Sequence, residues 1–291
     1  MELKEIRRKI ESVSNIGKLT GALETLSALK MKKSQKIALQ SRPFAQKIGH
    51  LMRHLEPVLK DVRAPLLNRK VKNILAIVVA SDRGFCGPFN QNVLRLAEKE
   101  IAALEGEAPV SVLSVGKKAT AFFKKKGKKI EYQFFGIGDY GELEEIKPIS
   151  DFMVREFIEN RFQRVYLVWT DFISTFSQKP KVARILPIET ETLELFMREE
   201  APQIDANPPV IEPSLETLYW EVVPQLIEYL LYQAILESNA SEHSARMVAM
   251  RNASDNARKR VIELTLDYNK ARQEQITREV TEISSAKEVL G

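Results

Sequence analysis

Residues 247–271 read MVAMRNASDNARKRVIELTLDYNKA, and the spacing of their apolar and small side chains decides the fold. These side chains recur in alternating steps of three and four, which is the pattern of a coiled-coil seam. The same steps extend back to Leu215, where a proline-rich stretch at 208–213 precedes them. The seam consists of Met247, Met250, Ser254, Ala257, Val261, Leu264, Tyr268 and Ala271.

The seam predicts one long C-terminal helix, which we place at residues 212–288. Pro224 falls inside this range, and we expect it only to kink the helix near its start. At 1.5 Å per residue the helix is roughly 110 Å long. A helix of that length does not fit inside an ordinary globular domain, so it must protrude.

A second helix is predicted at the N-terminus, over residues 1–58. Apolar residues recur three or four positions apart from Leu3 to Leu26, which marks one face of a helix, and Pro57 is the expected end. Small residues lie beside this face and would let a neighbouring helix approach closely. They are Gly17, Thr20, Gly21 and Ser27.

Between the two helices the pattern changes to strands that alternate with helices, over residues 72–206. This alternation predicts a Rossmann-like α/β domain with a largely parallel sheet. We expect strands at 73–80, 110–115, 130–134, 164–170 and 182–188, and helices at 90–104, 117–126 and 149–160.

The order of these parts predicts the architecture. Both terminal helices flank one inserted domain, so they must leave it at nearby points and run antiparallel. From its length, the first helix ends opposite about residue 271, and the apolar residues beyond that point, Ile276, Val280 and Ile283, are out of phase with the seam. The predicted fold class is α/β: a long antiparallel coiled coil of N- and C-terminal helices with an inserted Rossmann-like α/β domain, ending in a single-helix tip.

Composition restricts the function. Lys and Arg outnumber Asp and Glu by 44 to 39, an even mixture that is a weak signal for nucleic acid. Cys86 is the only cysteine, so the chain has no intrachain disulfide and fits a reducing compartment. The longest apolar run, Ile74–Ala80, is far shorter than the roughly 20 residues that span a bilayer. The N-terminus has the features of neither a signal peptide nor a transit peptide.

Two motifs have a chemical and a structural interpretation. The loop SDRGFCG at 81–87 follows a strand and precedes a helix, but it lacks the glycine and lysine spacing of a phosphate-binding loop, and a tight turn is the alternative. The lysine-rich stretch 117–129 suggests nucleic acid, or equally a helix with its phenylalanines on the sheet and its lysines in water. We therefore predict no catalytic, cofactor-binding or metal-binding residue.

Three stretches together resemble the gamma subunits of ATP synthases. Residues 6–16, IRRKIESVSNI, with KMKKSQ at 30–35, resemble the family's N-terminal helix. The loop at 81–87 is similar to its middle motif. EHSARMVAM at 242–250, DNA at 255–257 and YNKARQ at 268–273 are similar to its C-terminal helix. The likeness covers the whole length of the chain in the same order.

The resemblance implies the central rotor shaft of an F-type ATP synthase, a non-catalytic subunit that couples c-ring rotation, driven by protons or sodium ions, to ATP synthesis. The implied partners are three alpha and three beta subunits, the epsilon subunit and the c-ring, without nucleic acid. The implied location is peripheral, on the cytoplasmic face of the bacterial plasma (inner) membrane. The alternative is a coiled-coil scaffold without a catalytic role.

The resemblance also implies the residues that contact the catalytic head. Arg272, Gln273 and Thr277 are expected to make polar contacts with a beta-subunit loop near the tip, and Arg246 belongs to the coupling region lower on the same helix. The cluster Lys30, Lys32 and Lys33 is our hypothesis for a contact with an acidic beta-subunit surface.

Overall fold

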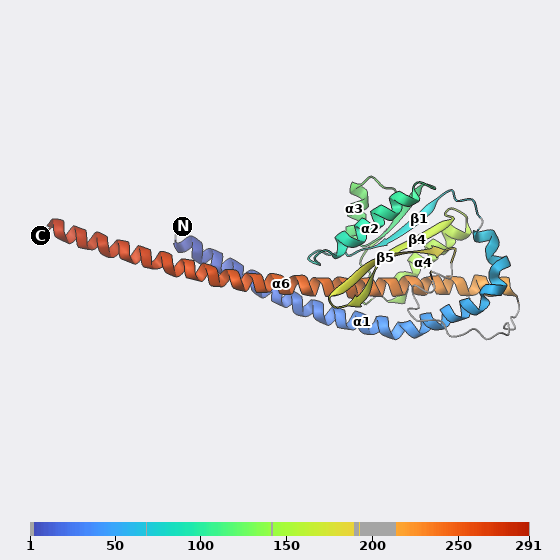
Figure 1. The fold of residues 1–291 in the computed structure, drawn as a ribbon, viewed down its shortest axis with the longest axis horizontal. Coiled ribbons are helices and arrows are strands. Elements are labelled where there is room, and N and C mark those ends of the chain that lie inside the picture. The colour runs from blue at the N-terminus through green and yellow to red at the C-terminus, as the bar shows by residue number, and fades with distance from the viewer. Residues whose placement is uncertain (1–2, 68, 141, 189–191, 193–213, 291) are drawn as a thin grey trace. The chain divides into compact units, whose positions relative to one another are not determined.

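The computed structural model describes residues 3–67, 69–140, 142–188, 192 and 214–290. The chain divides into two compact units, one formed by residues 1–27 with 246–291 and the other by residues 28–245. We call them the coil unit and the base unit. Helices α1 (Leu3–Leu67) and α6 (Leu215–Leu290) contribute to both (Figure 1).

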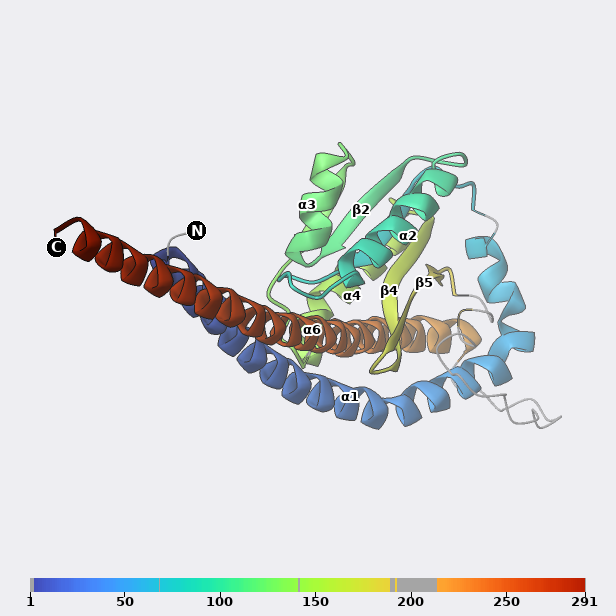
Figure 2. The same cartoon turned by 60° about the vertical axis from the view of Figure 1, so that its left-hand side comes forward.

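The two long helices confirm the predicted helical ends of the chain, with one difference in length. Helix α6 begins and ends within a few residues of the predicted range 212–288. Helix α1 does not end near Pro57 but continues to Leu67, and its C-terminal part bends (Figure 2). A proline removes one hydrogen bond from a helix, and α1 continues beyond this interruption.

The base unit contains a five-stranded sheet with the order β3-β2-β1-β4-β5. The first four strands are parallel, and β5 pairs with β4 in the antiparallel direction. The predicted, largely parallel sheet is therefore confirmed. The strands are β1 (Ile74–Val79), β2 (Val110–Val115), β3 (Ile130–Phe134), β4 (Arg164–Ser174) and β5 (Ser177–Leu186).

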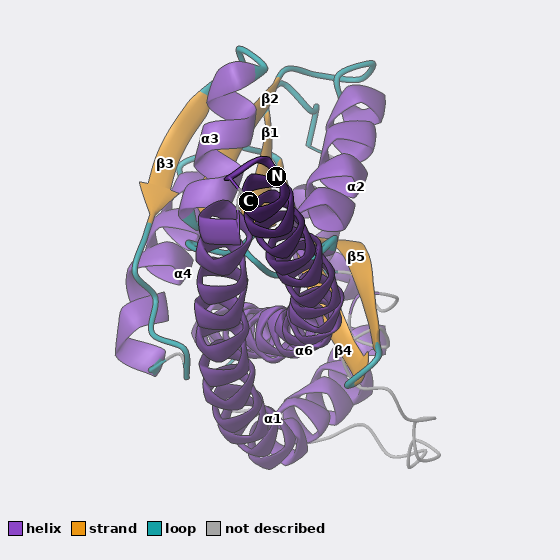
Figure 3. Cartoon of the chain, turned by 90° about the vertical axis from the view of Figure 1, so that its left-hand side faces the viewer, coloured by secondary structure: helices purple, strands orange, loops and turns teal. Residues whose placement is uncertain are grey.

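Side chains of β1 alternate between two hydrophobic cores, one on each face of the sheet. Ile74, Ala76 and Val78 pack with α2 (Phe89–Leu104) and α3 (Lys117–Lys125). The intervening residues pack with α4 (Leu143–Ile158) and α6. Figure 3 shows α2 and α3 on one side of the sheet and α4 and α6 on the other. All six residues of β1 are buried, as expected for a strand covered on both faces.

Helix α6 is part of this second core, which the sequence analysis had not anticipated. Seven of its side chains lie in the cluster with the sheet and α4, so α6 covers part of this face of the sheet. Burial of each Val, Leu or Ile among them stabilises the fold by about 1.5–3 kcal/mol. The seven are Val223, Leu226, Ile227, Leu230, Leu231, Ala234 and Ile235.

Within the described part of the chain, none of the helices offers an apolar stretch of the length and hydropathy that a bilayer crossing requires.

Gly116, between β2 and α3, provides a test of the fold. Its φ is +94°, and a Cβ built there would lie 2.0 Å from the Ala80 carbonyl oxygen. We expect Gly116→Ala to reduce the free energy of unfolding by about 3 kcal/mol or more, because strain and a backbone clash add. The matched control is Gly127→Ala, with φ +68° and nothing within 4 Å of the new Cβ, which we expect to lose about 1 kcal/mol. Urea denaturation measures both, and equal losses would contradict the assignment of a clash at Gly116.

Candidate functional site: the coil and its junction with the base

Small residues allow the two helices of the coil unit to approach closely. A Cβ built on Gly17 would lie 3.3 Å from the Ala257 Cβ, and the Ser254 hydroxyl donates a 3.3 Å hydrogen bond to the Gly17 carbonyl. Because a glycine and an alanine face each other here, the helix backbones pack at short range. The predicted seam is confirmed at its buried α6 positions, which are Met250, Ser254, Ala257 and Leu264.

The coil seam ends where the sequence predicted. Among the described side chains of α6, Tyr268 and Ala271 are the last half-buried ones, and every side chain from Arg272 to Ser284 is exposed. We call residues 272–284 the exposed end. Three of the predicted contact residues, Arg272, Gln273 and Thr277, lie on it.

An apolar stripe runs along this exposed end. Ile276, Val280 and Ile283 are 52%, 57% and 69% exposed, and their i, i+4, i+7 spacing places them on one face of the helix. At 100° per residue, Gln273 and Thr277 lie along one side of the stripe and Arg272 along the other. The predicted contact residues therefore border an apolar surface that faces solvent in the isolated chain.

The three lysines of the N-terminal cluster have different environments in the base unit. The Lys30 ammonium lies 2.5 Å from the Asp139 carboxylate and is directed at the chain itself. The Lys33 ammonium lies 3.7 Å above the ring of Tyr140 but remains exposed, and Lys32 is exposed as well. Lys32 and Lys33 are thus accessible to an acidic surface, whereas Lys30 already has an acidic partner. Arg246 is half-buried on α6.

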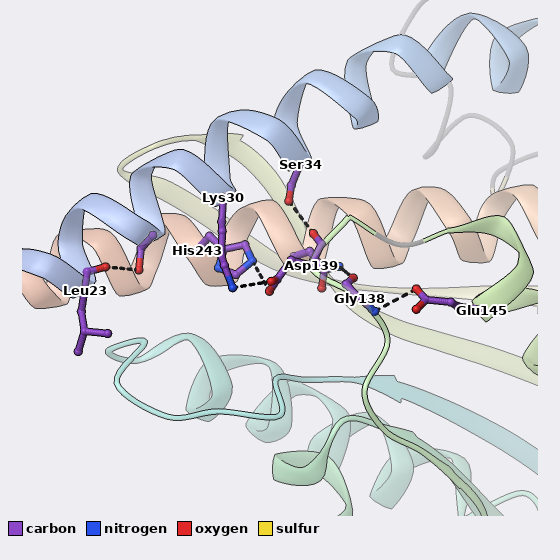
Figure 4. Close-up of polar contacts among 9 residues, drawn as sticks. Leu23, Lys30, Ser34, Gly138, Asp139, Glu145 and His243 are labelled. Carbon is purple, nitrogen blue, oxygen red and sulfur yellow. Dashed lines mark hydrogen bonds and ion pairs between the residues drawn. The ribbon is translucent and has the colours of Figure 1, made fainter.

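Asp139 joins the loop after β3 to both long helices (Figure 4). Its Oδ2 pairs with Lys30 of α1, and its Oδ1 lies 3.0 Å from Nε2 of the buried His243 on α6. Its carbonyl oxygen accepts a 2.8 Å hydrogen bond from the Ser34 hydroxyl. The Asn239 amide of α6 donates to the Gly138 carbonyl at 3.1 Å. We call this set of contacts the Asp139 junction.

The loop that carries Asp139 is ordered from its other side by the start of α4. The Glu145 carboxylate accepts hydrogen bonds from the backbone N–H of Gly138 at 3.0 Å and of Glu142 at 3.2 Å. The second bond is half of a capping box at the first turn of α4. Sequence reasoning missed Asp139, because a lone acidic residue in a glycine-containing loop has no partner at a recognisable spacing.

The charges around Asp139 favour its ionised form. Partial burial acts to raise the pKa of the carboxyl group, but the hydrogen bond from Lys30 and the positive charges of His243, Lys30 and Arg83 outweigh it. The net effect is a pKa below the ordinary value of 3.8. The junction is therefore held by an ionised carboxylate.

The polar groups of the loop at 81–87 are used inside the protein. Asp82 accepts hydrogen bonds of 2.8 Å from the backbone N–H of Lys117, at the start of α3, and of Gly136. The backbone N–H of Ser81 donates to the Asn90 amide oxygen at 3.0 Å. These bonds favour the tight-turn interpretation over phosphate binding, because the Asp82 carboxylate would repel an anion and the Ser81 N–H is already bonded to Asn90.

The lysine-rich stretch 117–129 also agrees with its structural interpretation, a helix with its phenylalanines on the sheet and its lysines in water. Phe123 is buried under α3, while the lysines of the helix are exposed. Lys126 pairs with Glu98 at 2.7 Å and Lys128 with Glu105 at 2.6 Å. Among the described residues, no group of three or more His, Cys, Asp and Glu side chains is arranged to hold a metal ion.

A two-helix coil and a Rossmann-like layer in one chain define a coiled-coil stalk protein. Residues 2–290 match the ATP synthase family. The chain is 37% identical to the ATP synthase gamma chain of Pelotomaculum thermopropionicum, covering 97% of this chain and 96% of the relative. It is 39% identical to that of Herpetosiphon aurantiacus, with the same coverage.

Solved structures share the fold. A chain of the Euglena gracilis mitochondrial ATP synthase (OSCP/F1/c-ring, rotational state 3) matches with a TM-score of 0.65 at 20% identity, covering 99% of this chain and 94% of that one. A chain of the Tetrahymena thermophila mitochondrial ATP synthase central stalk and c-ring matches with a TM-score of 0.60 at 22% identity, covering 81% and 99%.

The chain belongs to the ATP synthase gamma chain family. Members of this family are the non-catalytic central shaft of the synthase. The predictions of a rotor shaft and of a subunit that is not itself an enzyme are therefore confirmed.

The Asp139 junction gives stability a defined dependence on pH. Because the folded pKa lies below the unfolded one, the carboxylate contributes stability above about pH 4, and this contribution is lost as pH falls through the folded pKa. We expect Asp139→Asn to lower the free energy of unfolding at pH 6, and the difference from wild type to shrink towards pH 3. Urea denaturation at both pH values measures it. Asp151→Asn, an exposed position on α4, is the control and should change stability by less than about 0.5 kcal/mol at pH 6. A difference between wild type and Asp139→Asn that grew at low pH would contradict the assignment.

Proposed function

We propose that this chain turns inside a head of three alpha and three beta subunits, with its base unit against the epsilon subunit and the c-ring. The observation that carries the proposal is the exposed end of α6. Its stripe of Ile276, Val280 and Ile283 is accessible to solvent, and apolar stripes with polar borders mark surfaces that a partner covers. The partners named for the Euglena structure, F1 and a c-ring, are consistent with this assignment.

A shaft without a catalytic site acts by binding the conformations of its partners unequally. A single helix has a different chemical character on each side, so each orientation presents a different surface to each of three beta subunits. To move a two-state equilibrium from 1:99 to 99:1, the shaft must prefer one state by about 5.5 kcal/mol. Burying three large aliphatic side chains, at about 1.5–3 kcal/mol each, is of the right order. Rotation would then change the affinity of each beta subunit for ADP, phosphate and ATP in turn.

The polar contacts are assigned from the same surface. Gln273 and Thr277 border one side of the stripe and would hydrogen-bond a beta-subunit loop, while Arg272 on the other side would pair with a carboxylate. Lys32 and Lys33 would meet an acidic beta-subunit surface. Lys30 is not part of this proposed contact, because it is paired with Asp139. Arg246 would contribute to coupling from its half-buried position lower on α6.

The proposed location is the cytoplasmic face of a bacterial plasma membrane, where the chain is peripheral and held through the complex. The ATP synthase gamma chains of Pelotomaculum and Herpetosiphon, both bacterial, support this location. A c-ring driven by protons or sodium ions would supply the rotation.

Assembly tests the proposal directly. We expect the chain to co-purify with bacterial alpha and beta subunits as a complex of three alpha, three beta and one copy of this chain. This complex should hydrolyse ATP, whereas the isolated chain should not. A scaffold protein would instead self-associate through its coil. Failure to assemble with several bacterial heads, together with self-association, would overturn the proposal in favour of the scaffold.

The exposed end is tested by a matched pair of double variants. We expect Gln273→Ala with Thr277→Ala to reduce the ATPase rate of the assembled head by about tenfold, the effect of losing about 1.4 kcal/mol of contact energy. The control is Glu274→Ala with Arg278→Ala, which changes two exposed residues on the face of the helix opposite the stripe. Equal rates for the two double variants would show that the face bordered by Gln273 and Thr277 does not contact the head.

A further inference from the structure

The two long helices are held to the base sheet in different ways. Helix α6 contributes seven side chains to the hydrophobic core under the sheet. The two cores that cover the faces of the sheet contain no described residue of α1. Among the described residues, Lys30 and Ser34 of α1 form hydrogen bonds with Asp139, and Lys33 lies over the ring of the adjacent Tyr140. The Asp139 junction is thus a polar link between α1 and the layer.

The Asp139 junction contacts both long helices at the same position along their axes. Lys30 and Ser34 approach Asp139 from α1, while Asn239 and His243 approach the same loop from α6. These contacts come from α1 and from α6, and they meet in a segment of two residues, Gly138 and Asp139. A rotation of the two helices against the sheet would have to break them together.

The neighbouring residue of α6 is tied to a second loop. The Ser244 hydroxyl donates to the carbonyl of Thr175, in the turn between β4 and β5, and the Gln178 amide donates to that same carbonyl at 2.9 Å. Because successive residues of a helix point about 100° apart, His243 and Ser244 reach different loops of the base. Helix α6 is therefore fixed about its own axis at this level.

Directional contacts matter here because the described residues of α1 take no part in the close-packed cores of the sheet. Hydrophobic burial depends on the area removed from water and has no preferred direction. A hydrogen bond weakens steeply when its angle changes, and one to a charged group is about twice as strong as a neutral one. The side chain of His243 is 3% exposed, while those of Lys30 and Asp139 are 24% and 38% exposed, so the junction is screened from solvent mainly on its α6 side.

We propose that Asp139 is a positioning residue for rotary coupling, which transmits the turning force within the base unit between the loop after β3 and the two long helices α1 and α6. This inference rests on the proposed function of the chain as a shaft. Its chemistry is the ionised carboxylate, which holds Lys30 of α1 with one oxygen and His243 of α6 with the other. Replacing the carboxylate by a neutral amide removes the charge and one of the two acceptor oxygens, which weakens the contacts with Lys30 and His243 and lets α1 and α6 slip against the loop.

The experiment uses the complete synthase. The chain and its variants are expressed in a bacterial host that lacks its own gamma subunit, and inverted membrane vesicles are prepared. Proton pumping and ATP hydrolysis are measured on the same vesicles, normalised to the amount of assembled head. We expect Asp139→Asn to reduce the protons pumped per ATP hydrolysed by about twofold or more, the range in which single substitutions change coupling between distant sites.

Controls separate positioning from simple stability. Glu105→Gln removes an ion pair of similar length and exposure, that with Lys128 at 2.6 Å, which does not touch the coil. We expect this variant to keep the wild-type ratio. Lys30→Gln should lower the ratio as Asp139→Asn does, and Lys30→Arg should restore it, because the guanidinium keeps the charge-assisted bond.

Each outcome has one meaning. A purely structural role would reduce the amount of assembled enzyme while the ratio stays at the wild-type value, and this result would overturn the inference. If Asp139→Asn does not assemble, the pair Lys30→Gln and Lys30→Arg decides in its place, and equal ratios for these two would also overturn it. If the wild-type chain itself fails to assemble or pump, the proposed function fails rather than the role of Asp139.

Discussion

Burial of α6 against the base sheet is the constraint on which the rest of the structure depends. Seven aliphatic side chains between Val223 and Ile235 complete the core on one face of the sheet. At about 1.5–3 kcal/mol for each of the six Val, Leu and Ile side chains, their burial is comparable to the whole net stability of an ordinary domain, although the area-based figure is an upper bound. The sheet therefore cannot fold as a separate body from which a helix merely projects. The helix that becomes a coil strand is at the same time a core element of the base.

The character of α6 changes along its length as its environment changes. Residues 223–235 are apolar on more than one side, because they lie between the sheet and other helices. The seam of 247–271 is narrow and includes Ser254 and Ala257, which face a glycine of α1 at close range. The exposed end keeps only the stripe of Ile276, Val280 and Ile283. One continuous helix thus carries three successive hydrophobic patterns.

These patterns explain what the sequence could and could not predict. The steps of three and four from Met247 to Ala271 predicted the coil and its end, because periodicity reports which face of a helix is covered. The alternating strands and helices predicted the parallel sheet. The role of Val223–Ile235 was missed because a run that fits a coil seam also fits a core helix. The extension of α1 to Leu67 was missed because a proline signals an interruption without saying whether the helix resumes.

The candidate site was predicted unevenly for a physical reason. Arg272, Gln273 and Thr277 lie on a helix, where spacing alone fixes which side chains share a face. The lysine cluster also lies on a helix, but the fate of Lys30 depends on Asp139, more than a hundred residues away along the chain. Contacts of that kind arise from tertiary folding and leave no local pattern. They are also the directional contacts of the base, which add to the packing of the apolar core. A shaft needs both, because torque is transmitted only where rotation is resisted. For α1, whose described residues lie outside the two cores of the sheet, we assign that resistance to the polar Asp139 junction.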